Sequence, residues 1–191
     1  MIHSFRVCPW WLARALDNPI RRLIHNPEEI LRGHIEPGQT VLDLGCGSGT
    51  FTIAMAKMVG DAGKVIAVDV QDEMLQIVRQ KAVKEGLDSR IITHKSEPDR
   101  IGISDRVDFA LAFYMVHEVP DVKTFLKEIA SLLKPNGKLL IVEPLFHVSA
   151  SSFRSTVDAA KIAGLMPILE PKIRFSRSVL LQPDSSIFTQ A

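Results

Sequence analysis

The chain has 191 residues, of which 46% are hydrophobic and 24% are charged, and its formal net charge is +1. This length and composition are typical of one globular domain with a substantial core. Lysines and arginines are scattered among acids, which argues against a dedicated nucleic-acid surface. The longest uncharged apolar stretch, Phe109 to Val116, is too short to span a membrane.

The two cysteines, Cys8 and Cys46, provide no disulfide framework. The start of the chain also lacks the apolar run and cleavage site of a signal peptide. A cytoplasmic protein is therefore expected. The spacing of the cysteines and histidines matches no metal site, and the sequence does not identify the oligomeric state.

Residues 1–25 differ from the regular pattern that follows them. They contain both tryptophans, Trp10 and Trp11, and the basic pair Arg21-Arg22. We expect a helical segment whose apolar residues either pack on the core or cover the ligand pocket as a cap. The sequence leaves both alternatives open.

From residue 26 onwards, short apolar stretches alternate with helical patterns. Asn26 and Asp121 each predict a helix start, because their side chains can cap free backbone N–H groups. Buried strands are expected at 41–44, 64–70, 90–93, 107–113 and 139–142. Strands that alternate with helices predict a doubly wound, Rossmann-like α/β fold, with helices on both faces of a mostly parallel sheet.

Two further strands, 166–169 and 175–181, complete a seven-stranded sheet. The link between them, 170–174, is too short for a crossover helix. It therefore predicts a hairpin in which the last strand runs antiparallel. We expect the domain to occupy residues 26–183, followed by a tail at 184–191.

A glycine-rich turn follows the first of these strands. Gly45, Gly47 and Gly49 alternate after the apolar run Val41–Leu44, and a helical pattern of apolar residues begins at Phe51. Glycine allows sharp turns and the close approach of a ligand, and a helix start offers N–H groups to a polar or anionic ligand. This turn alone would also suit a nicotinamide-binding domain, although Thr50 matches the dinucleotide fingerprint poorly.

Two carboxylates make the pattern more specific. Asp43, two residues before the first glycine, would crowd a dinucleotide pyrophosphate but suits a cationic amino group. Asp69 ends the apolar run of the second strand, at the tip of which a carboxylate can accept hydrogen bonds from the ribose hydroxyl groups of an adenosine. With the antiparallel last strand, this combination resembles the class I S-adenosylmethionine (SAM)-dependent methyltransferases over residues 26–183, and a plain nicotinamide-binding fold lacks that last strand.

The resemblance implies a SAM site at the carboxyl ends of the strands, with S-adenosyl-L-homocysteine as the product. Gly45 and Gly47 would contact the methionine part, Asp43 its amino group and Asp69 the ribose. The remaining cofactor contacts that the resemblance implies are Cys46, Gly49, Val70, Gln71, Met74, Ser96, Glu97, Ala112 and Phe113. The pair Ser96-Glu97 departs from the family's usual pattern of an acidic residue followed by a small one.

The stretch Ala112–Glu118 bears on the reaction. At the tip of the fourth strand, Tyr114 and His117 would lie beside the sulfonium and face the substrate, which makes them the candidate catalytic residues. The unperturbed pKa of histidine lies near neutrality, so His117 could take a proton from the acceptor. The alternative is a structural histidine bonded to a nearby carbonyl group. Glu143, at the tip of the fifth strand, is expected to be structural.

We therefore predict a SAM-dependent methyltransferase acting on a small-molecule acceptor. The motifs are similar in texture to those of methyltransferases of quinone and other small-molecule metabolism. The alternatives are an RNA or protein methyltransferase, or a SAM-binding protein without transfer activity. A dedicated RNA enzyme would be expected to show a basic stripe or an Asn-Pro-Pro-Tyr-type tip on the fourth strand, where this chain has Ala112–Met115. The sequence does not identify the acceptor.

Overall fold

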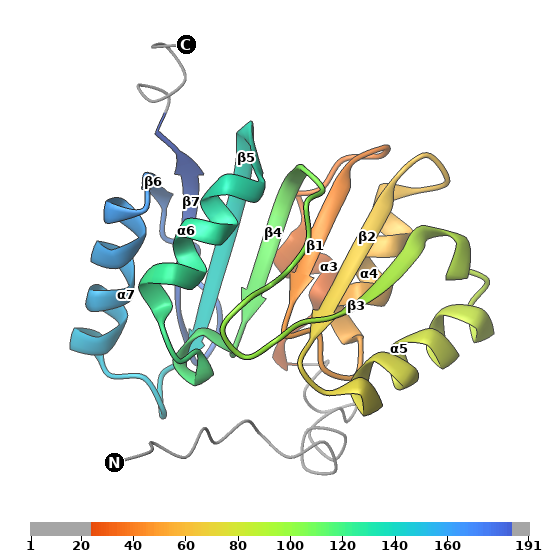
Figure 1. Cartoon of the computed structure of the whole chain (residues 1–191), viewed down its shortest axis with the longest axis horizontal. Helices are drawn as coiled ribbons and strands as arrows, with labels where there is room; N and C mark the ends of the chain where they lie inside the picture. The colour runs from red at the N-terminus through yellow and green to blue at the C-terminus, as the bar shows by residue number, and fades with distance from the viewer. Residues whose placement is uncertain (1–23, 185–191) are drawn as a thin grey trace.

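The computed structural model describes residues 24–184, which form a twisted sheet between two layers of helices (Figure 1). Within these residues, seven strands lie in the order β3-β2-β1-β4-β5-β7-β6. The strands are β1 (Thr40–Leu44), β2 (Lys64–Asp69), β3 (Ile91–Lys95), β4 (Val107–Phe113), β5 (Leu133–Pro144), β6 (Leu165–Leu169) and β7 (Ser176–Pro183). The helices of this part of the chain are α3 (Pro27–Leu31), α4 (Thr50–Val59), α5 (Asp72–Lys84), η1 (Asp88–Arg90), η2 (Val116–Glu118), α6 (Val122–Leu132) and α7 (Ala150–Ile162).

The predicted N-terminal segment, residues 1–25, lies outside the described residues except for Ile24 and His25. The predicted tail, residues 184–191, lies outside them except for Asp184.

The directions of the strands agree with the sequence prediction. β1 is parallel to its neighbours β2 and β4. β2 is also parallel to β3, and β4 is parallel to β5. β7 pairs antiparallel with both β5 and β6, so the link after β6 closes a hairpin. The predicted fold class, a Rossmann-like and mostly parallel sheet with an antiparallel last strand, is confirmed. Strand order reverses between β1 and β4, and in open sheets ligands bind at the carboxyl ends of the strands near such a point.

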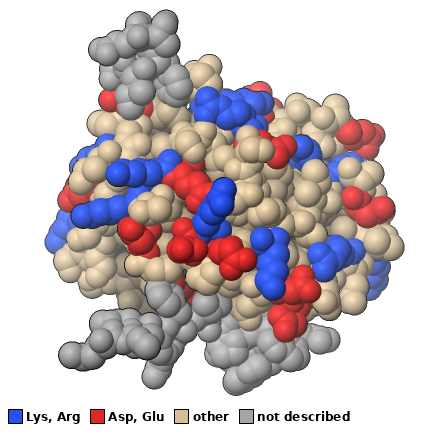
Figure 2. Space-filling view, viewed as in Figure 1, with Lys and Arg blue, Asp and Glu red and all other residues tan. Residues whose placement is uncertain are grey.

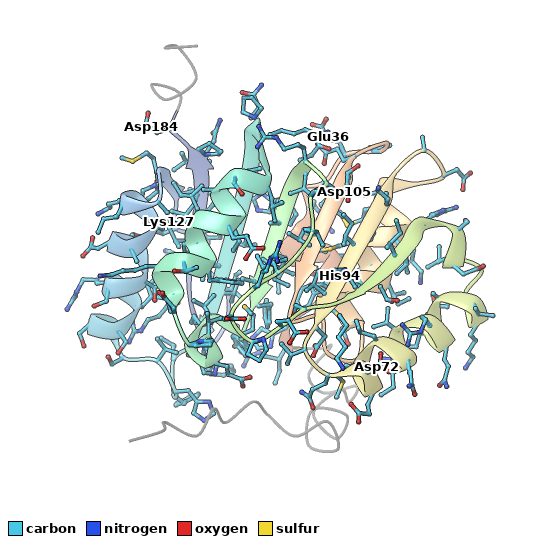
Figure 3. The ribbon with its side chains drawn as sticks, viewed as in Figure 1. Glu36, Asp72, His94, Asp105, Lys127 and Asp184 are labelled. Carbon is cyan, nitrogen blue, oxygen red and sulfur yellow. The ribbon has the colours of Figure 1, made fainter. Side chains whose placement is uncertain are left out.

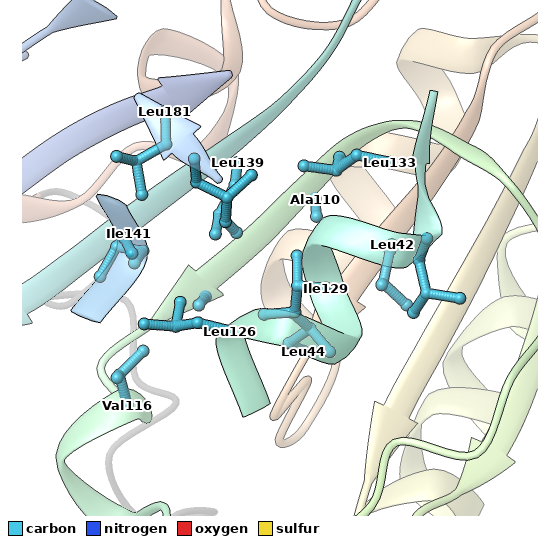
Figure 4. Close-up of a cluster of buried hydrophobic side chains, with 14 of the residues drawn as sticks. Leu42, Leu44, Ala110, Val116, Leu126, Ile129, Leu133, Leu139, Ile141 and Leu181 are labelled. Carbon is cyan, nitrogen blue, oxygen red and sulfur yellow. The ribbon is translucent and has the colours of Figure 1, made fainter. Parts of the chain in front are cut away.

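Alternate side chains of the central strands point to opposite faces of the sheet and are buried on both. On one face, Leu42 and Leu44 of β1 pack with Leu126 and Ile129 of α6, and each of the four is at most 1% exposed (Figure 4). On the other face, Val41 of β1 belongs to a second buried cluster with residues of α3 and α4. Burial of one large apolar side chain stabilises the fold by about 1.5–3 kcal/mol, so the strand ends that carry the site are held rigidly.

Two helix starts that the sequence predicts are capped in the expected way. The side-chain oxygen of Asn26 accepts a hydrogen bond from the backbone N–H of Glu28 at 3.0 Å. The carboxylate of Asp121 accepts from two backbone N–H groups of α6, at 3.0 and 3.1 Å. By contrast, α4 follows Gly49, which has no side chain to cap it. The start of α4 therefore presents backbone rather than side-chain groups at the carboxyl end of β1.

The fifth strand begins earlier than the sequence predicts. The expected strand starts at residue 139, whereas β5 already begins at Leu133. The register with β4 shifts between Val107 and Phe109, because β5 has extra residues there that bulge out of the ladder. Pro135 has no N–H to give to a regular ladder, which accounts for the position of the bulge.

Gly137 lies in this bulge, and its substitution should destabilise the domain. A Cβ atom there would lie 2.9 Å from the carbonyl oxygens of Lys134 and Val107, closer than real Cβ atoms come. We expect Gly137→Ala to lower the free energy of unfolding by about 1–3 kcal/mol in a urea titration. The exposed neighbour Asn136 provides the control, since Asn136→Ala should change this free energy by less than about 0.5 kcal/mol. Equal stability of the parent and Gly137→Ala would contradict this geometry.

Candidate functional site

A cavity of about 610 Å³ lies at the carboxyl ends of β1, β2, β4 and β5, where strand order reverses. Figure 3 shows this end of the sheet below, with Asp72 beside it, and the opposite end above, with Glu36 and Asp105. The predicted site residues that line the cavity are Gly45, Gly47, Asp69, Val70, Gln71, Met74, Ser96, Glu97, Phe113, Tyr114 and His117. The predicted residues that are not among its lining residues are Asp43, Cys46, Gly49 and Ala112.

The glycine turn borders the cavity beside β1. Gly45 has a φ of 62°, which favours glycine, and a Cβ atom there would lie 2.9 Å from the Cβ of Met115. Gly47 has a φ of 52°, and nothing lies within 4 Å of the place of its missing Cβ, so a ligand can approach its backbone. Cys46, in contrast, is buried with Leu75 of α5, and burial raises the pKa of its thiol. Cys46 therefore packs as a neutral side chain.

Asp69 ends β2 and joins two segments that line the cavity. Its Oδ2 accepts a hydrogen bond from the backbone N–H of Gly47, and its Oδ1 accepts one from that of Gln71, both at 2.9 Å. Burial raises the pKa of the Asp69 carboxyl, while its backbone hydrogen bonds act in the opposite direction. Each carboxylate oxygen can accept more than one hydrogen bond, so the geometry is compatible with the predicted contact to ribose hydroxyl groups.

Asp43 lies within β1 and is 2% exposed. Its Oδ2 accepts a hydrogen bond from the hydroxyl group of Thr52 on α4, at 2.6 Å. Burial raises the pKa of Asp43 to about 7. The hydrogen bond from Thr52 acts in the opposite direction and lowers the pKa, but burial has the larger effect. A nearby cationic amino group would stabilise the charged form of this carboxyl group. The predicted role of Asp43, to hold the amino group of SAM, stays a prediction.

His117 and Glu143 form a hydrogen-bonded acid–imidazole pair at the cavity wall. Nδ1 of His117 lies 2.5 Å from Oε2 of Glu143, and the two side chains are 27% and 2% exposed. The other carboxylate oxygen, Oε1, accepts a hydrogen bond from the backbone N–H of Val116 at 3.0 Å. The hydrogen bond with Glu143 raises the pKa of His117, against partial burial, which lowers it. This partner was not predicted from the sequence, since Glu143 was expected to be structural; an acid at the end of an apolar buried strand is the signal that could have indicated it.

Tyr114 lines the cavity, and its ring stacks on Phe113 at a centroid distance of 4.4 Å. Its hydroxyl group lies 2.7 Å from the hydroxyl oxygen of Ser176 and 3.1 Å from Nε2 of His25. A hydroxyl group held by protein partners is poorly placed to exchange a proton with a substrate.

Other lining residues were not predicted. Phe146 and Phe175 border the cavity after β5 and before β7, with ring centroids 6.2 Å apart, and they are 84% and 43% exposed. His147 also lines it, and its ring lies 6.2 Å from that of His117. The position of these residues next to strand ends is the one sequence signal that could have indicated them.

Charges of both signs are interspersed on the face of the molecule that Figure 2 shows. Within residues 24–184, no helix combines the length and the apolar character needed to cross a bilayer. The same part of the chain has no group of three or more His, Cys, Asp or Glu side chains arranged to hold a metal ion.

The strand order, the antiparallel β7, the glycine turn and the acid at the tip of β2 are together the features of a class I SAM-dependent methyltransferase. A family model described as a methyltransferase domain matches residues 41–137, about half of the chain. The chain belongs to this methyltransferase family, and the predicted class is confirmed.

Known proteins resemble the chain in sequence and in structure. It is 33% identical over 112 residues to a demethylmenaquinone methyltransferase of Halalkalibacterium halodurans, covering 59% of this chain and 46% of that protein. It is 30% identical over 159 residues to a ubiquinone biosynthesis O-methyltransferase of Xanthomonas axonopodis, covering 83% of this chain and 65% of that protein. Thus the chain spans less than two thirds of the length of either relative. A solved SAM dependent methyltransferase from Aquifex aeolicus has a TM-score of 0.83 and 28% identity, over 93% of this chain and 100% of that one.

The cavity fits SAM, the cofactor of this family. The open backbone at Gly47 leaves room for the ligand, and the carboxylate of Asp69 offers hydrogen-bond acceptors beside it. The volume of about 610 Å³ lies within the usual range of ligand pockets, about 300–1,000 Å³. The residues that would hold SAM are thus those of the β1 and β2 ends.

The raised pKa of Asp43 makes the stability of the domain depend on pH. In the folded protein this carboxyl group keeps its proton up to about pH 7, whereas in the unfolded chain it ionises near its ordinary pKa of 3.8. Stability is therefore lost as pH rises from about 4 to about 7, because the folded state binds the proton more tightly. Asp43→Asn removes this titration, so the stability of the variant relative to the parent should rise by about 2–4 kcal/mol between pH 4 and pH 8.

Urea unfolding of both proteins at several pH values measures this difference. The exposed Asp88 provides a matched control, because Asp88→Asn should follow the parent at every pH. If the free energies of unfolding of the parent and Asp43→Asn change with pH in the same way, burial of the ionised Asp43 carboxylate does not destabilise the folded protein.

Proposed function

We propose that the protein transfers a methyl group from SAM to a small, neutral acceptor with an ionisable hydroxyl group, and that His117 takes the hydroxyl proton. The observation that carries this proposal is the pair of His117 and Glu143 at the wall of the cavity, with Nδ1 and Oε2 2.5 Å apart. Family membership supports the type of reaction.

The partner on Nδ1 decides which nitrogen of His117 can act as a base. An ionised carboxylate only accepts, so the Nδ1–H of a neutral His117 donates to Glu143, and the lone pair stays on Nε2. Glu143 is held in turn by the N–H of Val116, which restricts the orientation of the pair. Once Nε2 carries the proton, the negative charge of Glu143 stabilises the imidazolium. Glu118, whose Oε1 lies 3.9 Å from Nε2, acts in the same direction.

When bound, SAM supplies a methyl group that is activated by its positively charged sulfur. The residues proposed to hold it, Gly47 and Asp69, lie on the β1–β2 side of the cavity, whereas His117 and Phe146 lie on the β4–β5 side. The protein must then orient the acceptor hydroxyl group between these two sides and exclude water from it. We assign the β4–β5 side to the acceptor.

The lining of the cavity favours a neutral acceptor. Arg100 is the one lysine or arginine among the described residues that line it, and it follows β3 on the cofactor side. A carboxylate or phosphate on the acceptor would therefore find no lysine or arginine of residues 24–184 at the cavity wall near His117. The names of the two relatives refer to demethylmenaquinone and to ubiquinone biosynthesis. A quinol fits this setting, because its ring is neutral and loss of its hydroxyl proton activates the oxygen and the ring carbon beside it toward the methyl group. A methylated oxygen keeps no proton, whereas a methylated ring carbon releases its own C–H proton and the oxygen is protonated again.

Substitution of His117 tests the proposed base. With methyl-labelled SAM and demethylmenaquinone reduced to its quinol, His117→Asn should lower kcat by about 10²–10⁴-fold, the usual contribution of a general base. Its affinity for SAM should stay close to that of the parent. The parent rate should fall as pH drops through the raised pKa of His117, because the protonated ring cannot accept a proton, and the variant should lose this dependence.

His34 provides the control, since it stacks on Phe109 outside the lining residues, and His34→Gln should keep the parental rate and pH profile. Parental turnover by His117→Asn would assign His117 a structural role. If the parent binds SAM but does not methylate the quinol, the proposed acceptor is contradicted. That result would favour the alternative of a SAM-binding protein without transfer activity.

A further inference from the structure

Three segments that are far apart in the sequence meet at one wall of the cavity. His25 precedes α3 and Tyr114 follows β4, while Ser176 begins β7 and Arg174 lies two residues before it. β7 runs antiparallel, so it begins at the edge of the sheet where β4 ends (Figure 1). We call His25, Tyr114, Ser176 and the carbonyl group of Arg174 the His25 cluster.

The carbonyl group of Arg174 decides which groups of the His25 cluster donate. A carbonyl oxygen only accepts, so the Nε2–H of His25 donates to it at 2.8 Å. The hydroxyl group of Ser176 donates to the same oxygen at 3.0 Å. The hydroxyl group of Tyr114 therefore donates to the hydroxyl oxygen of Ser176, and the two oxygens are 2.7 Å apart. This arrangement commits the proton of Tyr114 to a protein partner.

The His25 cluster holds two strained residues. Tyr114 and Phe175 are the non-glycine residues with positive φ among residues 24–184, at 60° and 56°. Both line the cavity, and Phe175 stands between Arg174 and Ser176 in the chain. Side chains other than glycine rarely adopt this conformation, and it persists only where the surroundings hold it. The backbone N–H of Tyr114 donates to the carbonyl group of Val142 at 2.8 Å, and the carbonyl group of Phe175 accepts from the N–H of Leu145 at 3.0 Å. The hydrogen bonds of the cluster add to this restraint.

His25 also packs against the aromatic wall. Its ring lies edge-on to those of Phe113 and Tyr114, at a centroid distance of 5.4 Å from each. It is 8% exposed, so its position is fixed by these contacts rather than by solvent. Edge-to-face packing of rings adds to the burial of their surfaces. Loss of the imidazole would thus remove a hydrogen bond and two ring contacts together.

We propose that His25 is a positioning residue for the acceptor, because it holds the ring of Tyr114 and the backbone of Phe175 in the conformations that shape one side of the cavity. The inference rests on the proposed function, which assigns the β4–β5 side to the acceptor. Tyr114 then acts as a wall and not as the catalytic group that the sequence predicts. The cofactor side, with Gly47 and Asp69, contains no residue of the His25 cluster and should not respond to changes in it.

The state of Tyr114 can be observed without any acceptor. It is the single tyrosine of the chain, so protein labelled with carbon-13 tyrosine gives one set of ring signals. In the parent we expect cross-relaxation between the rings of Tyr114 and His25, and His25→Ala should move the tyrosine signals toward those of a freely rotating ring. His25→Gln should keep them closer to the parent, because its side-chain amide can donate to the Arg174 carbonyl group. Ser176→Ala removes the partner of the tyrosine hydroxyl and should shift the signals with the imidazole in place.

Kinetics with the demethylmenaquinone quinol tests the effect on the acceptor. His25→Ala should raise the acceptor KM by roughly tenfold or more, as expected for a lost buried hydrogen bond. The Kd for SAM and kcat should change by less than about threefold, since the cofactor side and His117 are untouched. His25→Gln should restore most of the KM. Tyr114→Phe should keep kcat within about tenfold of the parent, because a wall residue needs its ring and not its hydroxyl group.

Several results would overturn the proposal. One is a set of tyrosine signals unchanged in His25→Ala and Ser176→Ala, and another is a kcat loss in Tyr114→Phe as large as that of His117→Asn. If His25→Ala does not fold, Ser176→Ala takes its place, and unchanged signals in that variant overturn the proposal by themselves. A parent that does not methylate the quinol contradicts the proposed function instead, and the tyrosine signals still decide whether His25 positions the wall.

Discussion

The cavity depends on the two hydrogen bonds that the carboxylate of Asp69 accepts. Asp69 ends β2, but one partner is the N–H of Gly47 in the turn after β1, and the other is the N–H of Gln71 at the start of α5. A turn rich in glycine has few side chains with which to fix itself, so a carboxylate from the neighbouring strand holds it. The same carboxylate is 7% exposed and lines the cavity, where ligand hydroxyl groups would offset part of the cost of its burial.

A second buried carboxylate, Glu143, organises the opposite side of the cavity. β4 and β5 are parallel neighbours and end at the same edge, so an acid at the end of β5 can reach His117 just after β4. The cofactor side is thus built from backbone groups and a carboxylate that accepts hydrogen bonds. The side proposed for the methyl acceptor is built from an imidazole and aromatic rings. Asp43 differs from both acids, because its one side-chain partner is a hydroxyl group and its pKa rises to about 7.

The fold could be predicted from the sequence because its signals are local. β1 and β4 are apolar runs between turn residues, and the short link before β7 excludes a crossover helix. The bulge of β5 escaped prediction, since it depends on the register with β4. The partner of His117 lies 26 residues away, and Tyr114 and His25 are 89 residues apart. These contacts exist only because strands and links that are remote in the sequence end at one edge of the sheet.

The most direct test of a SAM site at Asp69 is calorimetric titration of SAM into the parent and into Asp69→Asn. The amide keeps one acceptor oxygen but loses the charge, and each hydrogen bond to a charged group is worth about 1.5–3 kcal/mol. We predict that Asp69→Asn stays folded and binds SAM roughly tenfold to a thousandfold more weakly. The control Asp72→Asn, at a half-exposed position nearby, should bind SAM as the parent does. Parental affinity for SAM in a folded Asp69→Asn protein would contradict this site.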